Sequence, residues 1–479
     1  MNHYHASELR RRDADLATPF SVDIGAAGQS VWQCQAVLRW LPGKRLVMAL
    51  CRGDQRVLCK LFFSSRDYRR ELRGYRALAQ HQIATPALLD HAVLPGGGSV
   101  IRYEFIAAPT LEEVNSATPL TARSPALLHT VAAVAAMHRQ GLRQVDIHPG
   151  NFLVQHERVY VIDSAAVTTH RAPLRDRLAR DNLATLLAQF ETGQIDALEP
   201  IWQHYCRHWP AAPDWQREQL AAAVERMHKR RWRHYRAKLT RSCTEFGCRK
   251  GPRRFEVWRS DRDSAALQAM LQRPEACMAT GTALKRGNTA TVDRVQLDGG
   301  ELIIKRYNIK HWRHLLSRCW RPSRGWRSWH NAHYLLFNGL RTPQPVALIE
   351  ERWGPLRGRA FFICDFAHGQ DLKTYLQQAS PAQRSDTLRT FAAIIARYYR
   401  AGISHGDMKA NNFIVTDAGV TIIDLDPMRA HRRRAALEKA LRRDIERFLQ
   451  NFEGPLRAQL AGVLLPLLPA PLQRGPSRH

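Results

Sequence analysis

Long apolar segments and paired cysteines are both missing from this sequence of 479 residues. The longest apolar run near the end, 460–472, is short and interrupted by prolines, so it cannot span a bilayer. The nine cysteines include no CxxC pair and no spacing typical of a metal site, which favours a reducing compartment over a disulfide scaffold. Residues 1–16 carry charges but lack the apolar core of a signal peptide, so we expect no targeting segment.

Acidic residues are scarce relative to basic ones. The chain has 72 lysines and arginines against 43 aspartates and glutamates, a formal net charge of +29 at pH 7. This surplus predicts an anionic partner, which could be a nucleic acid, an anionic membrane surface or a phosphorylated substrate. Because no signature of a nucleic-acid-binding module is present, no nucleic acid is expected. The length and the 44% hydrophobic content suit two globular domains.

One pattern of polar residues occurs twice. An aspartate is followed after five residues by an asparagine and, after twelve more, by a second aspartate. The first motif is Asp146, Asn151 and Asp163, and the second motif is Asp407, Asn412 and Asp424. Kinase-type phosphotransferases use this order for a base that accepts the proton of the attacking hydroxyl and for two Mg²⁺ ligands. We therefore expect the first aspartate of each motif to be catalytic and the other two residues to hold Mg²⁺ beside ATP.

A strand that ends in a lysine precedes each motif. Lys60 and Lys305 are expected to contact the α- and β-phosphates of ATP. In kinases a glutamate on the next helix orients this lysine, and Glu71 fits that role in the first half. A gapless alignment on two Thr-Pro pairs, at 85–86 and 342–343, puts Ser328 at the matching place in the second half.

The two motifs also differ beside their bases. Lys409 stands two residues after the second base, where it can reach the γ-phosphate as a point charge, whereas the first motif has His148 there. His405 precedes the second base by two residues, and the first motif lacks this histidine. Neither motif ends in an Asp-Phe-Gly triplet, and candidates for a glycine-rich loop are weak, at 42–44 and 286–288.

The repeat extends over most of the chain. Each half has strands and one helix, then an acidic residue in an apolar strand where a hinge would lie, then mostly helical sequence. We expect an α+β protein of two tandem protein-kinase-like domains, each with a small β-rich N-lobe and a helical C-lobe. The domains are expected at 20–245 and 270–465, with a basic connector at 246–269. Asp181 and Asp444 are expected to accept hydrogen bonds from the backbone of the catalytic loops.

In its second half the sequence resembles the lipopolysaccharide core kinases, the heptose and Kdo kinase family. The segments that carry the resemblance are 303–308, 327–333, 342–345, 405–412 and 423–426. The first half is similar to a more divergent member. The resemblance implies a protein-kinase-like fold and ATP-dependent phosphorylation of an inner-core sugar on a lipid-anchored glycan. It also implies Asp407 as the base, Asn412 and Asp424 as metal ligands and Lys305 as the nucleotide lysine.

A basic segment with several tryptophans lies at 310–329. Such a segment suits an anionic membrane interface or the phosphates of a glycolipid. The residues expected to hold the protein at this surface are Arg313, Arg318, Arg321, Arg324, Trp312 and Trp320. The alternative is a solvated helix whose tryptophans belong to the core.

Together these features predict a kinase that uses ATP and Mg²⁺ on a heptose or Kdo hydroxyl of the lipopolysaccharide inner core. Its acceptor would be a lipid-linked core oligosaccharide. Its expected location is the cytoplasm, at the inner face of the cytoplasmic membrane. Two alternatives stay open, a protein Ser/Thr kinase or kinase/pseudokinase pair, and a non-catalytic factor for lipopolysaccharide assembly.

Overall fold

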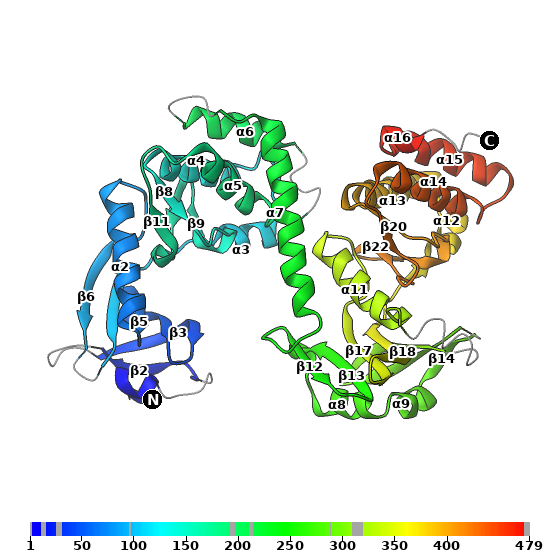
Figure 1. Ribbon diagram of the computed structural model, residues 1–479, viewed down its shortest axis with the longest axis horizontal. Helices are drawn as coiled ribbons and strands as arrows, with labels where there is room; N and C mark the ends of the chain where they lie inside the picture. The colour runs from blue at the N-terminus through cyan, green and yellow to red at the C-terminus, as the bar shows by residue number, and fades with distance from the viewer. Residues whose placement is uncertain are drawn as a thin grey trace. The chain divides into compact units, whose positions relative to one another are not determined.

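The computed structural model describes residues 2–10, 16–24, 31–94, 97–191, 197–209, 214–287, 289–308 and 320–473. The chain divides into two compact units, which we describe separately. Unit 1 is Met1–Phe190 with Gln194–His228, and unit 2 is Glu191–Gly193 with Lys229–His479. The boundary falls inside helix α7 (Arg217–Lys238) (Figure 1). Within the described ranges no helix is both long enough and apolar enough to cross a membrane.

Unit 1 begins with a seven-stranded sheet and one long helix (Figure 1). The strand order is β1-β2-β3-β4-β5-β7-β6, and every pair except β1–β2 is antiparallel. The elements are β1 (His3–His5), α1 (Ala6–Leu9), β2 (Phe20–Asp23), β3 (Val31–Leu41), β4 (Arg45–Arg52), β5 (Gln55–Phe62), α2 (Ser65–Gln80), β6 (Leu88–Val93) and β7 (Ser99–Glu104).

Alternation along β5 sets which face of this sheet meets the helix. Cys59 and Leu61 are buried in an apolar cluster on one face, whereas Phe62 packs with residues of α2 on the other. The buried residues of α2 recur every three or four positions, so one side of the helix covers the sheet. Lys60 has the same parity as Phe62, so it projects toward α2, where Glu71 lies on the buried side of the helix.

The rest of unit 1 is mainly helical. Its helices are α3 (Leu111–Ala117), α4 (Pro125–Arg139), α5 (Asp176–Leu187), α6 (Leu198–Arg207) and α7. Two short antiparallel pairs lie among them, β9 (Phe152–Gln155) with β10 (Arg158–Val161) and β8 (Leu142–Gln144) with β11 (Val167–Thr169). The 3₁₀ turns η1 (Pro149–Asn151) and η2 (Ser164–Ala166) adjoin these strands. The first motif lies on the connections between these short elements.

Unit 2 also combines a seven-stranded sheet with helices. The strand order is β12-β13-β17-β18-β16-β15-β14, and all pairs are antiparallel. The first elements are β12 (Phe246–Lys250), β13 (Arg254–Arg259), η3 (Ser260–Arg262), α8 (Ala265–Gln272), α9 (Pro274–Thr280), β14 (Thr282–Arg286), β15 (Ala290–Leu297), β16 (Gly300–Tyr307), α11 (Arg324–Phe337), β17 (Pro345–Trp353) and β18 (Leu356–Asp365). Helix α11 packs against this sheet, mainly on β17 and β18.

The remainder of unit 2 is again mainly helical. Its helices are α12 (Leu372–Gln378), α13 (Pro381–Ala401), α14 (Arg434–Leu449), α15 (Gly454–Leu467) and α16 (Ala470–Gln473). The short elements are β19 (Gln370–Asp371), β20 (Ile403–Ser404), η4 (Ala410–Asn412), β21 (Phe413–Thr416), β22 (Gly419–Ile422) and β23 (Arg429–Ala430). The second motif lies on the connections among η4, β21 and β22.

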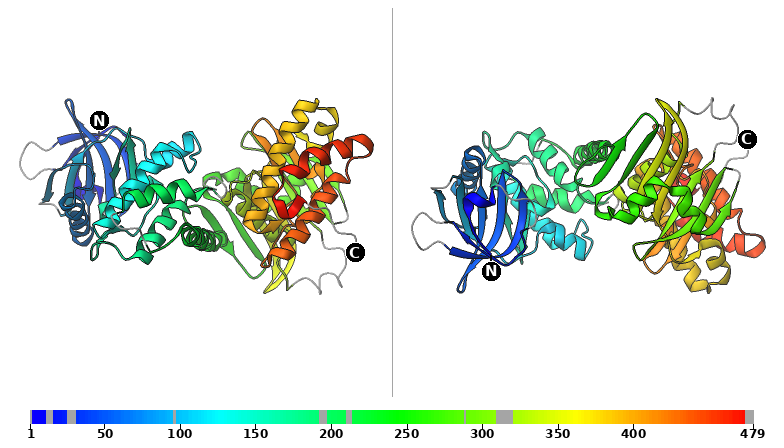
Figure 2. Two further views of the ribbon diagram at one scale, coloured as in Figure 1. Left: turned by 90° about the horizontal axis from the view of Figure 1, so that it is seen from above. Right: turned by 90° about the horizontal axis from the view of Figure 1, so that it is seen from below.

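Five strands of each sheet follow one order. In unit 1 it is β3-β4-β5-β7-β6 and in unit 2 it is β14-β15-β16-β18-β17, with α2 or α11 between the third and fourth strands along the chain. Figure 2 shows, for each unit taken by itself, a sheet-rich part and a helical part. This mixture of sheets and helices confirms the expected α+β class.

The expected connector, 246–269, contributes regular structure to unit 2. It contains β12, β13 and η3 and the start of α8. Phe255 and Val257 alternate along β13 and are buried in the main core of unit 2, although charged residues surround them in the sequence. Unit 2 also begins earlier than expected, at Lys229, because Trp232 and Tyr235 in the second half of α7 pack against the same core.

Candidate active site

A threonine fixes the strand that leads to the last aspartate of each motif. Thr85 Oγ1 donates a hydrogen bond to the carbonyl of Val161 at 2.9 Å, and Thr342 Oγ1 donates to the carbonyl of Ile422 at 2.8 Å. Both threonines follow the helix that packs on the sheet. The Thr-Pro pairs used to align the two halves therefore make one contact in the same place in each unit.

The asparagine of each motif folds the catalytic loop in the same way. Asn151 Nδ2 donates to the carbonyl of Asp146, and Asn412 Nδ2 donates to the carbonyl of Asp407, both at 2.8 Å. Because the amide nitrogen is engaged by the loop, the amide oxygen is the atom left to face a cation. Each motif thus presents an oxygen donor at its second position.

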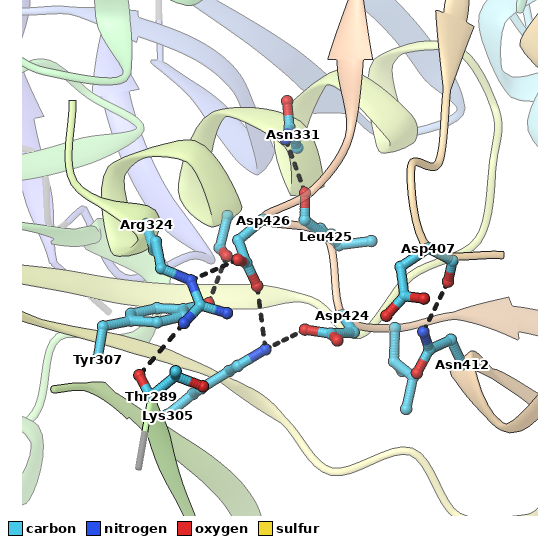
Figure 3. Close-up of polar contacts among 12 residues, drawn as sticks. Thr289, Lys305, Tyr307, Arg324, Asn331, Asp407, Asn412, Asp424, Leu425 and Asp426 are labelled. Atoms are coloured by element: carbon cyan, nitrogen blue, oxygen red, sulfur yellow. Dashed lines mark hydrogen bonds and ion pairs between the residues drawn. The ribbon is translucent and has the colours of Figure 1, made fainter. Parts of the chain in front are cut away.

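The last aspartate of each motif has an unusual backbone. Asp163 and Asp424 have φ values of 61° and 58°, in the left-handed region that few residues other than glycine adopt. Figure 3 shows the carboxylate of Asp424 between the amine of Lys305 and the pair of Asp407 and Asn412. With this backbone turn the carboxylate of Asp424 points toward the amine of Lys305 (Figure 3).

The donor atoms of the second motif fit Mg²⁺. The carboxylate of Asp424 and the amide oxygen of Asn412 are hard oxygen donors, which Mg²⁺ prefers together with water and substrate phosphates. No cluster of three or more His, Cys, Asp or Glu side chains suited to a metal occurs in the part of the chain that the structure describes.

Lys305 lies in an acidic environment. Its amine contacts Asp424 Oδ1 and lies 3.3 Å from Asp426 Oδ1 (Figure 3). Burial lowers the pKa of Lys305, but Tyr307 and the two aspartates raise it, and the net pKa is above the ordinary value. For the acid Asp424 burial acts in the opposite direction and raises the pKa, but the Lys305 ammonium outweighs burial and holds the pKa of Asp424 below its ordinary value. Both groups are therefore charged at neutral pH.

In unit 1 the corresponding lysine is held by an acid on the helix. Lys60 Nζ lies 2.5 Å from Glu71 Oε1, and Glu71 is completely buried. Its other oxygen accepts a hydrogen bond from the backbone N–H of Ala165, two residues after the last motif aspartate, at 3.2 Å. Asp163 itself pairs with Arg45 Nη1 of β4 at 3.5 Å. Glu71 therefore ties α2 both to the lysine and to the loop.

In unit 2 the charges are placed differently. Ser328, at the position of Glu71, is buried and shares a 2.6 Å hydrogen bond with the hydroxyl of Tyr307. Arg324, one turn earlier on α11, binds Asp426 Oδ2 through Nε at 2.6 Å (Figure 3). Asp426 stands two residues after the last motif aspartate and also faces Lys305. The acid that joins helix, lysine and loop is thus on the loop.

The first aspartates of the two motifs, which the sequence predicts to be bases, have different surroundings. Asp407 Oδ1 lies 2.7 Å from Arg447 Nε, as an ion pair without hydrogen-bond alignment, and Oδ2 lies 3.8 Å from Lys409 Nζ. Asp146 is exposed, and within the described ranges its carboxylate forms no ion pair. Only the second motif thus surrounds its base with cations.

The expectation for Asp444 is confirmed. It is 4% exposed and accepts hydrogen bonds from the backbone N–H groups of His405 at 2.7 Å and Gly406 at 3.1 Å. Burial raises its pKa to about 6, although these two donors act in the opposite direction. Asp444 therefore fixes the backbone just before Asp407.

The expectation for Asp181 is wrong. Its carboxylate contacts Arg180 and Arg226 and has no contact with the loop. The neighbouring Asn182 is buried instead and donates to the carbonyl of Gln144 at 2.9 Å. The repeated Arg-Asp pair suggested Asp181, but the helix turns the following residue toward the loop.

Gln144 also replaces the histidine that the first motif lacks. Its Nε2 donates to the carbonyl of Ile162 at 2.8 Å, and in unit 2 the buried ring of His405 contacts the carbonyl of Ile423 through Nε2 at 3.2 Å. Both carbonyls belong to the residue just before the last motif aspartate. A side chain two residues before the base supports this position in both units.

The basic segment is only partly described. Arg313, Arg318 and Trp312 lie outside the described residues. Trp320 is 72% exposed and Arg321 is exposed, as a surface contact requires. Arg324 does not fit the expected anchoring role, because its guanidinium is bound to Asp426. Trp326 and Trp329, in α11, belong to the core of unit 2, which favours the alternative that the tryptophans of this helix are structural.

The fold and the site define a class. A sheet with one helix packed on it, a helical part, and an Asp-Asn-Asp loop set beside a strand lysine are the components of a protein-kinase-like phosphotransferase. Residues 277–462 match the model of the lipopolysaccharide kinase (Kdo/WaaP) family. This match confirms the resemblance seen in the sequence, and the matched segment is similar to that kinase family.

Comparisons with whole proteins are weaker. The structure of WbdD with the kinase inhibitor LY294002 is 18% identical over 41% of this chain and 46% of that chain, with a TM-score of 0.28. A single-substitution form of the Mycobacterium tuberculosis PknI kinase domain is 13% identical over 41% of this chain and 83% of that chain, with a TM-score of 0.25. The chain spans less than half the length of the WbdD structures it matches. No curated protein sequence matches it.

Proposed function

We propose that unit 2 is an ATP- and Mg²⁺-dependent kinase for a heptose or Kdo hydroxyl of the lipopolysaccharide inner core. The observation that carries the proposal is the grouping of Lys305, Asn412 and Asp424 beside Asp407 in a segment that matches a lipopolysaccharide kinase family. Phosphoryl transfer asks a protein mainly to position groups and to neutralise charge, and this set supplies both.

Asp407 accepts the proton of the acceptor hydroxyl. Asn412 holds the loop that carries it, through the 2.8 Å bond to its carbonyl, and Asp444 holds the residues before it. Lys409 and Arg447 flank the carboxylate, with Lys409 Nζ 3.8 Å and Arg447 Nε 2.7 Å from its oxygens. Lys409 also approaches the phosphoryl group in transfer, as a point charge.

Asn412 and Asp424 are the residues that would hold Mg²⁺. When bound, Mg²⁺ neutralises charge on the phosphate oxygens. Lys305 binds the nucleotide phosphates, and its ammonium exchanges its contact with Asp424 for them. Asp426 and Arg324 keep the lysine and the helix in place during this exchange, because their ion pair does not involve Asp424.

A second role is proposed for unit 1. Its Asp163 pairs with Arg45, whereas Asp424 pairs with the motif lysine Lys305. Its first motif aspartate also has no cations in the positions of Lys409 and Arg447. These differences favour a kinase-like domain that supports unit 2 rather than one that transfers phosphate. This chain would then contain a pair of kinase-like domains and act at the inner face of the cytoplasmic membrane, where ATP and the lipid-linked core oligosaccharide meet.

The test combines purified protein with cells. In vitro, the full chain is incubated with Mg²⁺-ATP and lipid-linked core oligosaccharide. In cells, the mass of the core oligosaccharide from a strain that lacks the protein is measured by mass spectrometry. The proposal predicts one added phosphate in vitro and one missing phosphate in the strain. An unchanged oligosaccharide with altered phosphoproteins would instead support a protein kinase, and a missing sugar would support a non-catalytic assembly factor.

A further inference from the structure

A large groove lined by many cations lies in unit 2 beside Asp426. Its volume is about 2030 Å³, and its walls are the start of α11, the connection around 426–431 and one side of α14. Gly406, Lys409 and Arg447 line it, and all three adjoin or contact Asp407, whereas Asp407 itself, Lys305, Asn412 and Asp424 do not line it. The groove thus lies next to the proposed base without including the residues proposed to hold ATP and Mg²⁺.

The charge of the groove is strongly unbalanced. Its described lining contains ten lysines and arginines against three acids. All three acids have partners already: Asp426 binds Arg324, Asp444 accepts backbone hydrogen bonds, and Glu446 pairs with Arg457 at 2.6 Å. The remaining cations are therefore not neutralised by the acids of the groove.

Five of these cations have no acidic partner in the part of the chain that the structure describes. They are Arg321, Arg327, Arg429, Lys439 and Arg443. Arg327 is half-buried and its Nε has no hydrogen-bond partner; burial lowers its pKa, and the charge of Asp426 offsets that effect only in part. A cation that is partly withdrawn from water and incompletely paired is costly, and an anionic ligand would offset that cost.

The cations of α14 form a line that leads away from the base. Lys439, Arg443 and Arg447 are spaced four residues apart, so they lie on one side of the helix and span about 12 Å. Arg447 contacts the base Asp407. A molecule whose hydroxyl reaches Asp407 would therefore lie along Arg443 and Lys439, with Arg327 and Arg429 on other parts of the lining.

We infer that this groove binds the acceptor through anionic groups and selects a saccharide that carries two or more phosphates or carboxylates. Lys439, Arg443 and Arg327 hold these groups, and the hydroxyl to be phosphorylated faces Asp407. The inference rests on the function proposed for unit 2 and adds the chemical class of its acceptor. A groove suits a saccharide better than a flat lipid surface, because Arg327 is half-buried within it.

The test uses glucose 1,6-bisphosphate as the probe, with glucose 1-phosphate and glucose for comparison. Calorimetry with the full chain should show affinity that falls in that order and survives saturation with a non-hydrolysable ATP analogue and Mg²⁺. The double substitution Lys439→Gln with Arg443→Gln should weaken binding of the bisphosphate by about tenfold or more, since both lose charge-assisted contacts. Nucleotide affinity should not change.

The matched control is Lys373→Gln with Arg389→Gln. These cations lie on α12 and α13 and do not line the groove, so the control should bind the bisphosphate like the wild type. Equal weakening in the control would show a general effect of charge, and displacement of the sugar by nucleotide would place it at the ATP site. Either result overturns the inference.

Two further outcomes separate this inference from the proposed function. If the wild type phosphorylates core oligosaccharide and the groove variant does so with an unchanged KM, the groove inference fails and the proposed function stands. If the sugar bisphosphate binds as described but no phosphate is transferred, the proposed function fails and the groove stands. Binding of anionic vesicles, but not of the sugar, that depends on Lys439 and Arg443 would reassign the groove to a lipid surface.

Discussion

In both units an acidic side chain links the strand lysine, the helix that packs on the sheet and the loop that follows the last motif aspartate. The acid lies on a different one of these elements in each unit. In unit 1 the acid is on the helix, where Glu71 binds Lys60 and the backbone of Ala165. In unit 2 the acid is on the loop, where Asp426 faces Lys305 and receives Arg324 from the helix. The lysine, helix and loop are linked in both.

This comparison explains a feature that looks like a defect in the sequence. A kinase-like domain without the helix glutamate lacks the usual partner of its nucleotide lysine. In unit 2 the partner of Lys305 is Asp426, which lies on the loop. The helix has Ser328 in place of the glutamate, and one turn earlier it carries Arg324, which binds Asp426. Unit 2 therefore holds Lys305 in place without a glutamate on the helix.

The largest stability effect is expected in unit 1. Glu71→Gln removes the charge that offsets the buried Lys60 ammonium, and an uncompensated buried charge costs about 3–5 kcal/mol. Urea unfolding would measure the loss, with Glu157→Gln in an exposed turn as the control. Phosphotransfer per folded molecule should stay at the wild-type rate. A loss of stability no greater than in the control would show that the pair is not the link we describe.

The next effect concerns Asp444 and depends on pH. Its pKa is raised from an ordinary 3.8 to about 6 in the folded protein, so the folded state favours the protonated form. Its contribution to stability is then fully present below pH 3.8 and is lost as pH rises through about 6. Against Asp444→Asn, the wild type should lose up to about 3 kcal/mol between about pH 4 and about pH 7, from the shift of about two pKa units. A difference between the two proteins that stays constant with pH would contradict the raised pKa.

The ion pair of Arg324 with Asp426 in unit 2 should contribute less to stability than the pair of Lys60 with Glu71 in unit 1. Arg324→Gln leaves Asp426 with Lys305 alone, at a cost of about 1–3 kcal/mol, because the arginine is 30% exposed. Arg324→Lys keeps the charge and should recover part of the loss, together with part of the nucleotide affinity. Urea titration and nucleotide binding would be compared with Arg321→Gln, whose side chain is exposed. Identical behaviour of Arg324→Gln and Arg321→Gln would remove Arg324 from the link.

The smallest effect is expected where the helix touches the loop. In unit 1 the contact is made by Gly74, where an added Cβ would lie 1.8 Å from the carbonyl oxygen of Ser164. At the matching place in unit 2, Asn331 Nδ2 donates to the carbonyl of Leu425 at 2.8 Å (Figure 3). Asn331→Ala should cost about 1 kcal/mol, the usual worth of one hydrogen bond. Urea unfolding against the exposed Gln377→Ala tests this, and equal stability of the two variants would contradict it.

The sequence was sufficient where partners are set by short, fixed spacings. The Asp-Asn-Asp motifs and the Thr-Pro pairs aligned the two halves correctly, and the structure shows the same contacts at both, because a loop or strand end of constant length carries each of them. Which side of a helix faces the loop was harder to predict. The sequence suggested that Asp181 contacts the loop, but the contact is made by the next residue, Asn182.

Other features depend on distant partners and escaped the sequence. Arg324 and Asp426 are 102 residues apart, and the basic segment suggested a membrane contact for Arg324 rather than an internal ion pair. Strand β13 was not predicted, because its charged residues obscure the alternation of apolar residues, of which Phe255 and Val257 are buried. In both cases the missing signal was the three-dimensional neighbour that neutralises or covers the residue.

The central claim is that unit 2 carries the phosphotransfer, and replacing the two bases tests it most directly. The full-length variants Asp407→Asn and Asp146→Asn are compared with wild type for Mg²⁺-ATP-dependent transfer to lipid-linked core oligosaccharide, after urea unfolding has shown that both are folded. Asp407→Asn should lose about 10²–10⁴-fold in kcat, the usual worth of a positioned base, and Asp146→Asn should turn over like wild type. Wild-type turnover in Asp407→Asn together with an inactive Asp146→Asn would contradict the account and move catalysis to unit 1.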